Sequence, residues 1–192
     1  MRLYELRDAA LASGRLVFSL GLLAKLAGVP ESHAKVYAHR LVARGMAWRV
    51  RRGGVAFTHD TFVIASQLVE PSYVSMHAAL YLRGVADQVP SIVECVTTRS
   101  PLWLRELGVR YRRVAGALFF GYERVNRAGS YAFVALPEKA VLDMVYYGGS
   151  PDCSQLDLDA KALREMAEAY RRVGGYRARR VVRWVECFVR RS

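Results

Sequence analysis

The stretch that decides the fold of the first part of the chain is SLGLLAKLAGVPESHAKVYAHRLVARG, residues 19–45. Ser19 is placed to cap a helix over 20–27, because its hydroxyl can accept a hydrogen bond from a free N–H of the first turn. Gly28 breaks that helix, and Pro30 suits the first position of the next one, since its missing N–H would have no partner there. We expect the next helix to end at about Arg44, before Gly45. Two helices joined by a short turn are therefore predicted.

The second of these helices has two chemically different faces. Its apolar positions recur at helical spacing on one side and are Ala34, Ala38, Leu41 and Val42. Its basic positions lie mostly off that side and are Lys35, His39, Arg40 and Arg44. One face is expected to pack against the protein and the other to be polar.

The flanking residues complete a recognisable module. Apolar positions at helical spacing predict a helix over residues 3–11, ahead of the pair. After the pair, residues 47–51 and 55–58 alternate as strands do, and Arg52-Gly53-Gly54 between them is a hairpin turn signal. Three helices followed by a basic hairpin predict a winged helix-turn-helix. With a helix over 61–69 that ends before Pro71, this domain is expected to occupy residues 1–70.

The remainder, residues 71–192, is predicted to be a mixed α+β domain with a helical C-terminus, so the chain as a whole is assigned to the α+β class. Helices are expected over residues 74–83, 137–147, 156–173 and 176–191, and strands over residues 91–98, 109–114, 122–126 and 131–135. The final helix is basic and amphipathic, and contact with DNA, contact with an acidic partner and plain solvation stay open for it.

Charge favours a polyanionic partner. The chain carries 29 Lys and Arg against 17 Asp and Glu, a formal net charge of +12. No acid lies between Glu31 and Asp60, a window that contains the predicted second helix of the pair and the hairpin. A helix-turn-helix places its second helix in the major groove, and cations beside it contact phosphates. We therefore expect double-stranded DNA as partner, bound by Ser32, His33, Lys35, Val36, His39, Arg40, Arg44, Arg49, Arg51 and Arg52.

Other interpretations of these residues exist. Winged helices also dock proteins, and runs of charge are commonly solvated faces. His33 and His39 are on a helix surface where a histidine is often without a special role. Trp48 is expected to pack against the helices rather than to stack on a base.

Most other function classes lack their motifs. The spacings of nucleophile elbows and nucleotide-binding loops are absent, and Asp159-Ala160-Lys161, the sole nuclease-like triplet, opens a helix. Glu138-Lys139 with Asp143 and His77 resembles an acid–base set, but Glu138 in a first helical turn is ordinarily a dipole partner. No enzyme activity, cofactor or metal is expected.

Localisation and cysteine usage are the last sequence expectations. The charged N-terminus and the lack of a long apolar run predict a cytoplasmic protein without a membrane span. The cysteines are far apart, so we interpret them as small buried apolar residues; they are Cys95, Cys153 and Cys187.

Ordered motifs in residues 3–150 resemble those of the AbiEi antitoxin family of abortive-infection systems. The motifs are Pro71, Tyr73-Val74-Ser75, Ala79-Leu80-Tyr81, Gly84, Val96-Thr97-Thr98, Phe119-Phe120-Gly121-Tyr122, Ala135, Pro137-Glu138-Lys139-Ala140, Leu142-Asp143 and Tyr146. The resemblance implies a winged-helix repressor that binds operator repeats of its own operon. It also implies a C-terminal domain that neutralises a nucleotidyltransferase-like toxin. A stand-alone transcriptional regulator, whose C-terminal domain senses or docks something else, is the alternative.

Overall fold

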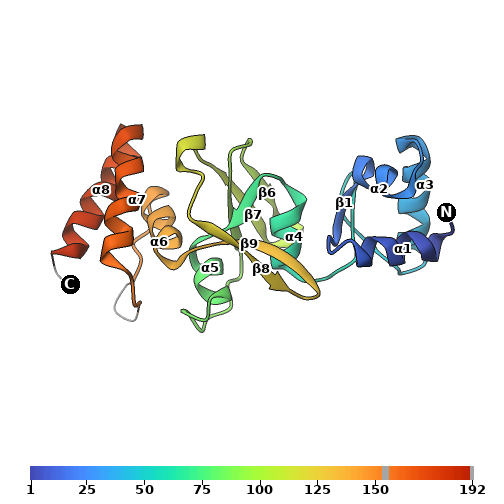
Figure 1. The fold of residues 1–192 in the computed structure, drawn as a ribbon, viewed down its shortest axis with the longest axis horizontal. Coiled ribbons are helices and arrows are strands. Elements are labelled where there is room, and N and C mark those ends of the chain that lie inside the picture. The colour runs from blue at the N-terminus through green and yellow to red at the C-terminus, as the bar shows by residue number, and fades with distance from the viewer. Residues whose placement is uncertain (153–155, 191–192) are drawn as a thin grey trace. The chain divides into compact units, whose positions relative to one another are not determined.

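The computed structural model describes residues 1–152 and 156–190, and its fold class is α+β, as predicted (Figure 1). The chain divides into two compact units. The first comprises Met1–Glu70 with Arg124–Ala132, and the second comprises Pro71–Glu123 with residues 133–192. Residues 124–132, which the sequence assigned to the second domain, group with the first unit because Arg127 pairs with Asp60 at 2.7 Å and Ser130 is bonded to Gln67.

The first unit consists of four helices and a three-stranded antiparallel sheet in the order β1-β3-β2. Its elements are α1 (Leu3–Ala12), β1 (Val17–Ser19), α2 (Leu20–Ala27), α3 (Glu31–Ala43), β2 (Trp48–Arg51), β3 (Gly54–Ala56) and α4 (Thr61–Leu68). The helices follow the predicted positions, whereas β1 was not predicted. Pro30 lies just before α3, as its N-cap, and not at the first helical position.

Local chemistry explains the ends of α2. The Ser19 hydroxyl accepts a hydrogen bond from the Leu22 N–H at 3.2 Å, as its predicted capping role requires. Gly28 ends the helix in the left-handed region at φ 66°, where a side chain would be strained. Its neighbour Val29 then donates its N–H to the Ala24 carbonyl at 3.1 Å, which closes the turn toward α3.

The core of the first unit lies among α1, α2, α3 and the sheet. Leu6, Leu23 and Leu41 are fully buried there, with Phe18 and Val55 from β1 and β3. Burying a leucine side chain contributes about 1.5–3 kcal/mol, so these residues fix the helices to the sheet.

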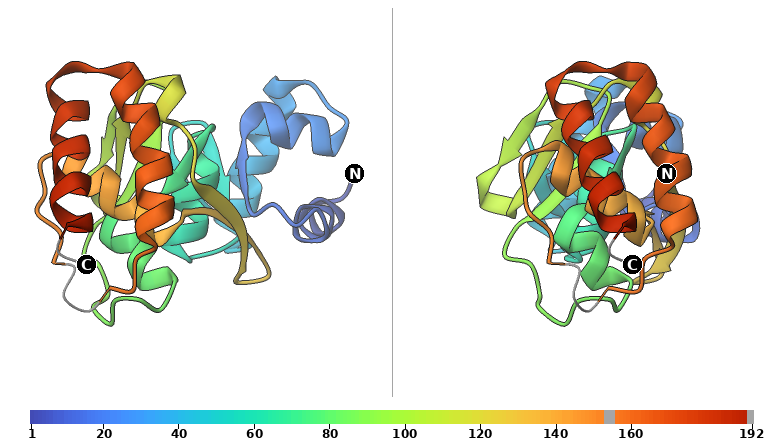
Figure 2. Two further views of the ribbon diagram at one scale, coloured as in Figure 1. Left: turned by 60° about the vertical axis from the view of Figure 1, so that its left-hand side comes forward. Right: turned by 90° about the vertical axis from the view of Figure 1, so that its left-hand side faces the viewer.

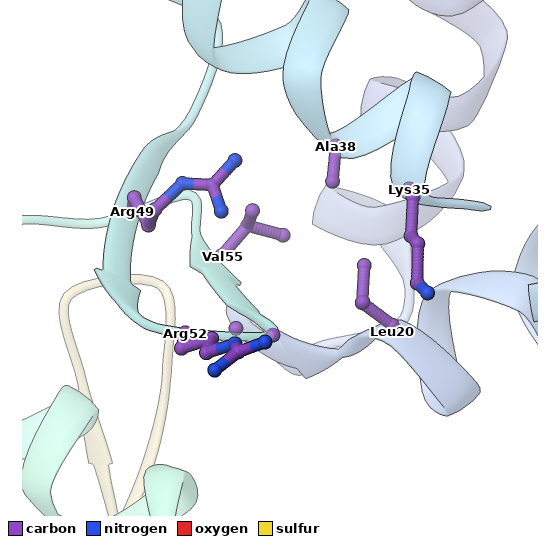
Figure 3. A pocket seen from close by; sticks show the side chains of 8 residues that line it. Leu20, Lys35, Ala38, Arg49, Arg52 and Val55 are labelled. Atoms are coloured by element: carbon purple, nitrogen blue, oxygen red, sulfur yellow. The ribbon is translucent and has the colours of Figure 1, made fainter. Parts of the chain in front are cut away.

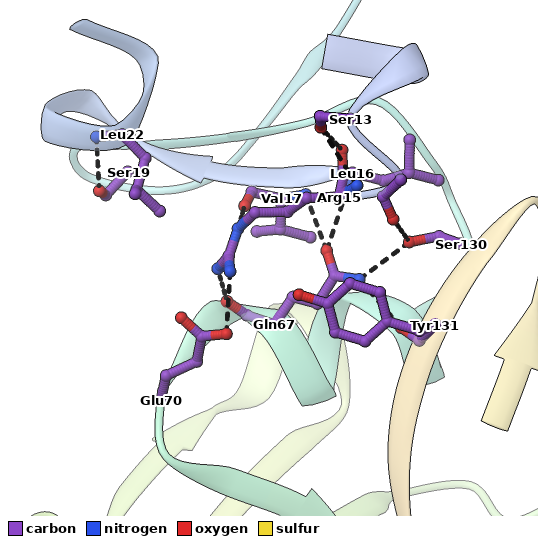
Figure 4. A network of polar contacts seen from close by, with 11 residues as sticks. Ser13, Arg15, Leu16, Val17, Ser19, Leu22, Gln67, Glu70, Ser130 and Tyr131 are labelled. Carbon is purple, nitrogen blue, oxygen red and sulfur yellow. Dashed lines mark hydrogen bonds and ion pairs between the residues drawn. The ribbon is translucent and has the colours of Figure 1, made fainter. Parts of the chain in front are cut away.

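A buried glutamine joins three segments of the first unit (Figure 4). The Gln67 Oε1 atom accepts hydrogen bonds from the N–H groups of Leu16 and Val17 at 2.9 and 3.1 Å. Its Nε2 group donates to the Ser130 hydroxyl and to the Tyr131 carbonyl, both at 2.9 Å. This amide therefore ties α4 to β1 and to residues 130–131.

A mixed sheet in the order β6-β7-β5-β4-β9-β8 belongs to the second unit except for the parts of β8 and β9 within residues 124–132, which group with the first. In this sheet β4 pairs in parallel with β9 and β5 with β7. The strands are β4 (Ser72–Val74), β5 (Val93–Thr97), β6 (Leu102–Leu104), β7 (Val109–Arg113), β8 (Tyr122–Arg127) and β9 (Ser130–Ala135). Strands β4 and β6 were not predicted. The helix expected over 74–83 begins later, at Met76, because Val74 belongs to β4 and Ser75 is the N-cap.

The α-helices of the second unit are α5 (Met76–Leu82), α6 (Pro137–Tyr146), α7 (Ala160–Val173) and α8 (Gly175–Val189), and two short 3-10 helices, η1 (Arg105–Leu107) and η2 (Gly116–Leu118), accompany them. The predicted helix over 156–173 begins later, because the Asp159 carboxylate caps it by accepting from the Lys161 N–H at 2.7 Å. Helices α7 and α8 run side by side in both views of Figure 2.

A cluster of polar side chains is completely buried between α6, α7 and the sheet. Lys139 and Asp143 form an ion pair one turn apart on α6, and neither side chain is exposed. The Asp143 Oδ2 atom accepts from the Ser75 and Tyr73 hydroxyls at 2.7 and 3.0 Å, and the Lys139 ammonium donates to the Tyr170 hydroxyl at 2.9 Å. Burial lowers the pKa of Lys139, an effect that Asp143 opposes.

The cysteine prediction is partly wrong. Cys95 is buried in β5 as expected, and burial raises the pKa of its thiol. Cys187 is exposed, because it lies off the buried α8 stripe of Ala178, Val181 and Val185. Cys153 lies outside the described residues. In the described part of the chain, no helix is long and apolar enough to cross a membrane.

Candidate nucleic-acid interface

Helix α3 presents the polar face that the sequence predicted. Ala34, Ala38 and Leu41 are buried against the unit, and they fix the rotation of the helix about its axis. The opposite side is exposed and carries Ser32, His33, Lys35, Val36, His39, Arg40 and Arg44. Val36 is an apolar member of this face and is 47% exposed.

The hairpin of β2 and β3 supplies the remaining candidates. Arg49, Arg51 and Arg52 are all exposed. The register of the two strands shifts between Arg49 and Arg51, which marks a bulge. Gly53 turns the chain at φ 79°, a conformation that a residue with a side chain rarely adopts.

A cavity of about 400 Å³ lies between α3 and this hairpin (Figure 3). Its lining combines a small apolar surface with three cations, and consists of Leu20, Lys35, Ala38, Arg49, Arg52, Gly53, Gly54 and Val55. The structure thus brings together Lys35 from the helix with Arg49 and Arg52 from the hairpin. The remaining candidates lie outside the cavity lining.

Sequence reasoning did not select Leu20, Ala38 or Val55 as part of this site. Their apolar character signalled packing alone, and that is part of their role, because Ala38 and Val55 are buried. The glycine pair at 53–54 was identified only as a turn. To predict that this pair lies beside the cations, one would have needed to know how the hairpin folds back toward α3.

The cations of this surface are not neutralised by the protein. Within residues 1–152 and 156–190, none of the side chains of Lys35, Arg40, Arg44, Arg49, Arg51 and Arg52 forms an ion pair or a hydrogen bond. The acids of the first unit are mostly occupied elsewhere. Asp8 pairs with Arg7 at 2.7 Å, Glu70 with Arg15 at 2.9 Å, and Asp60 with Arg127 at 2.7 Å. A concave surface with uncompensated positive charge results, which is suited to a polyanion.

Trp48 packs inside the hairpin region. Its ring stacks on His59 with centroids 4.9 Å apart, and its indole N–H donates to the Thr58 carbonyl. These partners directly follow the hairpin, whereas the sequence predicted that the ring would pack against the helices.

The acid–base set considered from the sequence is dispersed in the structure. Lys139 and Asp143 are buried together, whereas His77 is exposed. The Glu138 carboxylate accepts a hydrogen bond from the Asp159 N–H at 3.1 Å. Across the two described ranges, no three His, Cys, Asp or Glu side chains come together as metal ligands.

Comparison with known proteins returned no family model that matches this chain and no curated protein that matches it.

Proposed function

We propose that this protein is a DNA-binding transcriptional repressor whose first unit is a winged helix-turn-helix. In this proposal α2 and α3 are the helix-turn-helix, α3 enters the major groove, and the β2–β3 hairpin is the wing. The observation that carries the proposal is the cavity between α3 and the hairpin, where Lys35, Arg49 and Arg52 meet without any carboxylate in the lining.

The two parts of the surface have different expected roles. Lys35 and Arg40 project from the exposed side of α3, from which side chains reach base edges. Arg49, Arg51 and Arg52 stand on the hairpin, which would follow the phosphate backbone and so add affinity without sequence information. The sequence preference would therefore be set by α3, and the salt dependence mostly by the hairpin.

We further propose that the full chain acts as an antitoxin. The support is the ordered set of motifs that resemble those of the AbiEi family, several of which lie in the sheet and in α6 of the second unit. In this role the first unit would repress the operon and the second would neutralise a nucleotidyltransferase-like toxin. A stand-alone regulator would keep the first activity and lack the second.

Duplex DNA binding is tested by fluorescence anisotropy with the full chain at several salt concentrations. The variant Arg49→Ala/Arg51→Ala/Arg52→Ala should weaken binding to all duplex sequences alike, and it should reduce the slope of log K against log salt by up to about 2.7. The control is Arg105→Ala/Arg113→Ala/Lys161→Ala, which removes the same charge from exposed positions of the second unit. Equal losses in both variants would show that net charge alone drives binding.

The antitoxin role is tested by co-expression with the product of a neighbouring gene of the nucleotidyltransferase class. The full chain should restore growth. The full-length hairpin variant should also restore growth, although it can no longer repress transcription. No rescue by the full chain would leave the stand-alone regulator.

A further inference from the structure

Helix α8 carries arginines that the fold uses and arginines that it does not. Arg180 donates to the Tyr146 carbonyl at 2.7 Å, and the Arg177 guanidinium lies 5.9 Å from the centre of the Tyr146 ring. Arg179 and Arg183 are exposed, and within the described residues neither has an ion pair, a hydrogen bond or a ring contact. Among the described residues, these two guanidinium groups therefore have no polar partner in the fold.

Both unused arginines line the same groove. A cavity of about 500 Å³ between the end of α7 and the first half of α8 is lined by Tyr170, Arg171, Gly174, Arg179, Val182 and Arg183. Among the residues that the structure describes, no carboxylate lines this groove. Arg171 is the one cation of the groove with acidic partners, because Glu168 and Glu186 hold its guanidinium.

A second cavity on the same helix pair provides a contrast. It measures about 300 Å³ and is lined by Arg164, Glu168, Arg171, Val185, Glu186, Val189 and Arg190. Its two glutamates stand among its arginines, so that its charge is largely balanced within the protein. Glu168 and Glu186 thus line this cavity, and Arg171, which both of them hold, lines both cavities; among the described residues no acid lines the first one.

We propose that the groove formed by Arg179, Val182 and Arg183 binds the phosphate backbone of duplex DNA as a second contact, separate from the α3 surface. Arg179 and Arg183 are one helical turn apart, about 6 Å along the axis. Two unpaired cations in an open groove attract a polyanion. The proposal depends on the charges of α7 and α8, and not on α3 reading base pairs.

The test compares two full-length variants that lose the same charge from the same helix pair. Arg179→Ala/Arg183→Ala changes the basic groove, and Arg164→Ala/Arg190→Ala changes the balanced one. Affinity for a random duplex is measured between about 50 and 200 mM salt. The first variant should bind roughly tenfold or more weakly and lose about 1.8 from its log–log salt slope. The second should change far less.

Three outcomes would overturn the proposal once circular dichroism has shown that both variants are folded. The first is an unchanged affinity and slope in Arg179→Ala/Arg183→Ala. The second is an equal loss in the balanced-groove variant. The third is unchanged DNA binding with loss of binding to poly-glutamate, which would assign the groove to an acidic protein. The Arg179→Ala/Arg183→Ala pair is also introduced into the hairpin variant. A further loss of DNA affinity in this combined variant would support DNA binding by the groove, even if the α3 surface proved not to bind DNA.

Discussion

Removing the buried ammonium of Lys139 should be one of the most damaging single changes in the second unit. In Lys139→Met the side-chain volume is nearly kept, so that the main effect is the loss of the charge. Asp143 would then be a buried carboxylate without its ion-pair partner. It would retain the hydrogen bonds from Tyr73 and Ser75 at 3.0 and 2.7 Å.

The expected magnitude follows from that environment. Neither side chain of the pair is exposed to solvent, and breaking a buried pair from one side costs about 3–5 kcal/mol. The double variant Lys139→Met/Asp143→Leu removes both charges, so its loss should fall below the sum of the two single losses. Coupling of up to about 3 kcal/mol is expected for groups in direct contact. The hydroxyls of Tyr73 and Ser75 would still lose their acceptor, and the double variant should therefore remain less stable than the parent.

The assay is urea denaturation in a Trp48→Phe background, where the remaining tryptophans, Trp103 and Trp184, both belong to the second unit. The control is Lys161→Met on α7, the same substitution at a side chain that is 85% exposed. That control should change the free energy of unfolding by less than about 0.5 kcal/mol. A loss below about 1 kcal/mol for Lys139→Met would refute the reasoning, because it would mean that the buried charge is not compensated by Asp143 in the folded protein.

Three further outcomes follow from the structure. Gln67→Leu should destabilise the first unit by several kcal/mol, because the two N–H groups that donate to its amide oxygen would be buried without partners. Thermal denaturation measures this loss, and a change within about 0.5 kcal/mol, the size of a surface effect, would contradict the prediction. Gly121→Ala should also destabilise the protein, since Gly121 has φ 73° and an added Cβ would lie 3.1 Å from Lys139 carbons. The same assay should show no loss of stability for Gly116→Ala, because no atom lies within 4 Å of a Cβ added there. Burial raises the pKa of the Tyr170 phenol well above 10.0. Above pH 10 the unfolded chain therefore loses the phenol proton while the folded chain keeps it, and the free energy of unfolding falls as the pH rises. Tyr170→Phe should reduce that fall by up to about 1.4 kcal/mol per pH unit in urea denaturation, and an unchanged slope would show that the phenol ionises in the folded protein.

Local sequence determined the parts of this protein that are stabilised by neighbours along the chain. The bounds of α2 follow from the Ser19 cap and from Gly28, both of which act within one turn of the helix. The exposed basic face of α3 also follows from the sequence, because its period of 3.6 residues separates Ala34 and Ala38 from Lys35. The cations of the candidate interface could be selected for this reason, although which of them share a cavity could not.

Tertiary structure decided the features that join residues distant in the chain. Strands β1 and β4 have three residues each, too few to show alternation, and they exist through pairing with β3 and with β5 and β9. The hydroxyl groups that donate to Asp143, on Tyr73 and Ser75, lie about 70 residues earlier, so no local pattern could reveal that Lys139 would be buried. The groove of Arg179 and Arg183 likewise forms only when α7 packs on α8. Local hydrogen bonds and side-chain periodicity are encoded within a few residues, whereas burial and cavities depend on which surfaces meet in the folded chain.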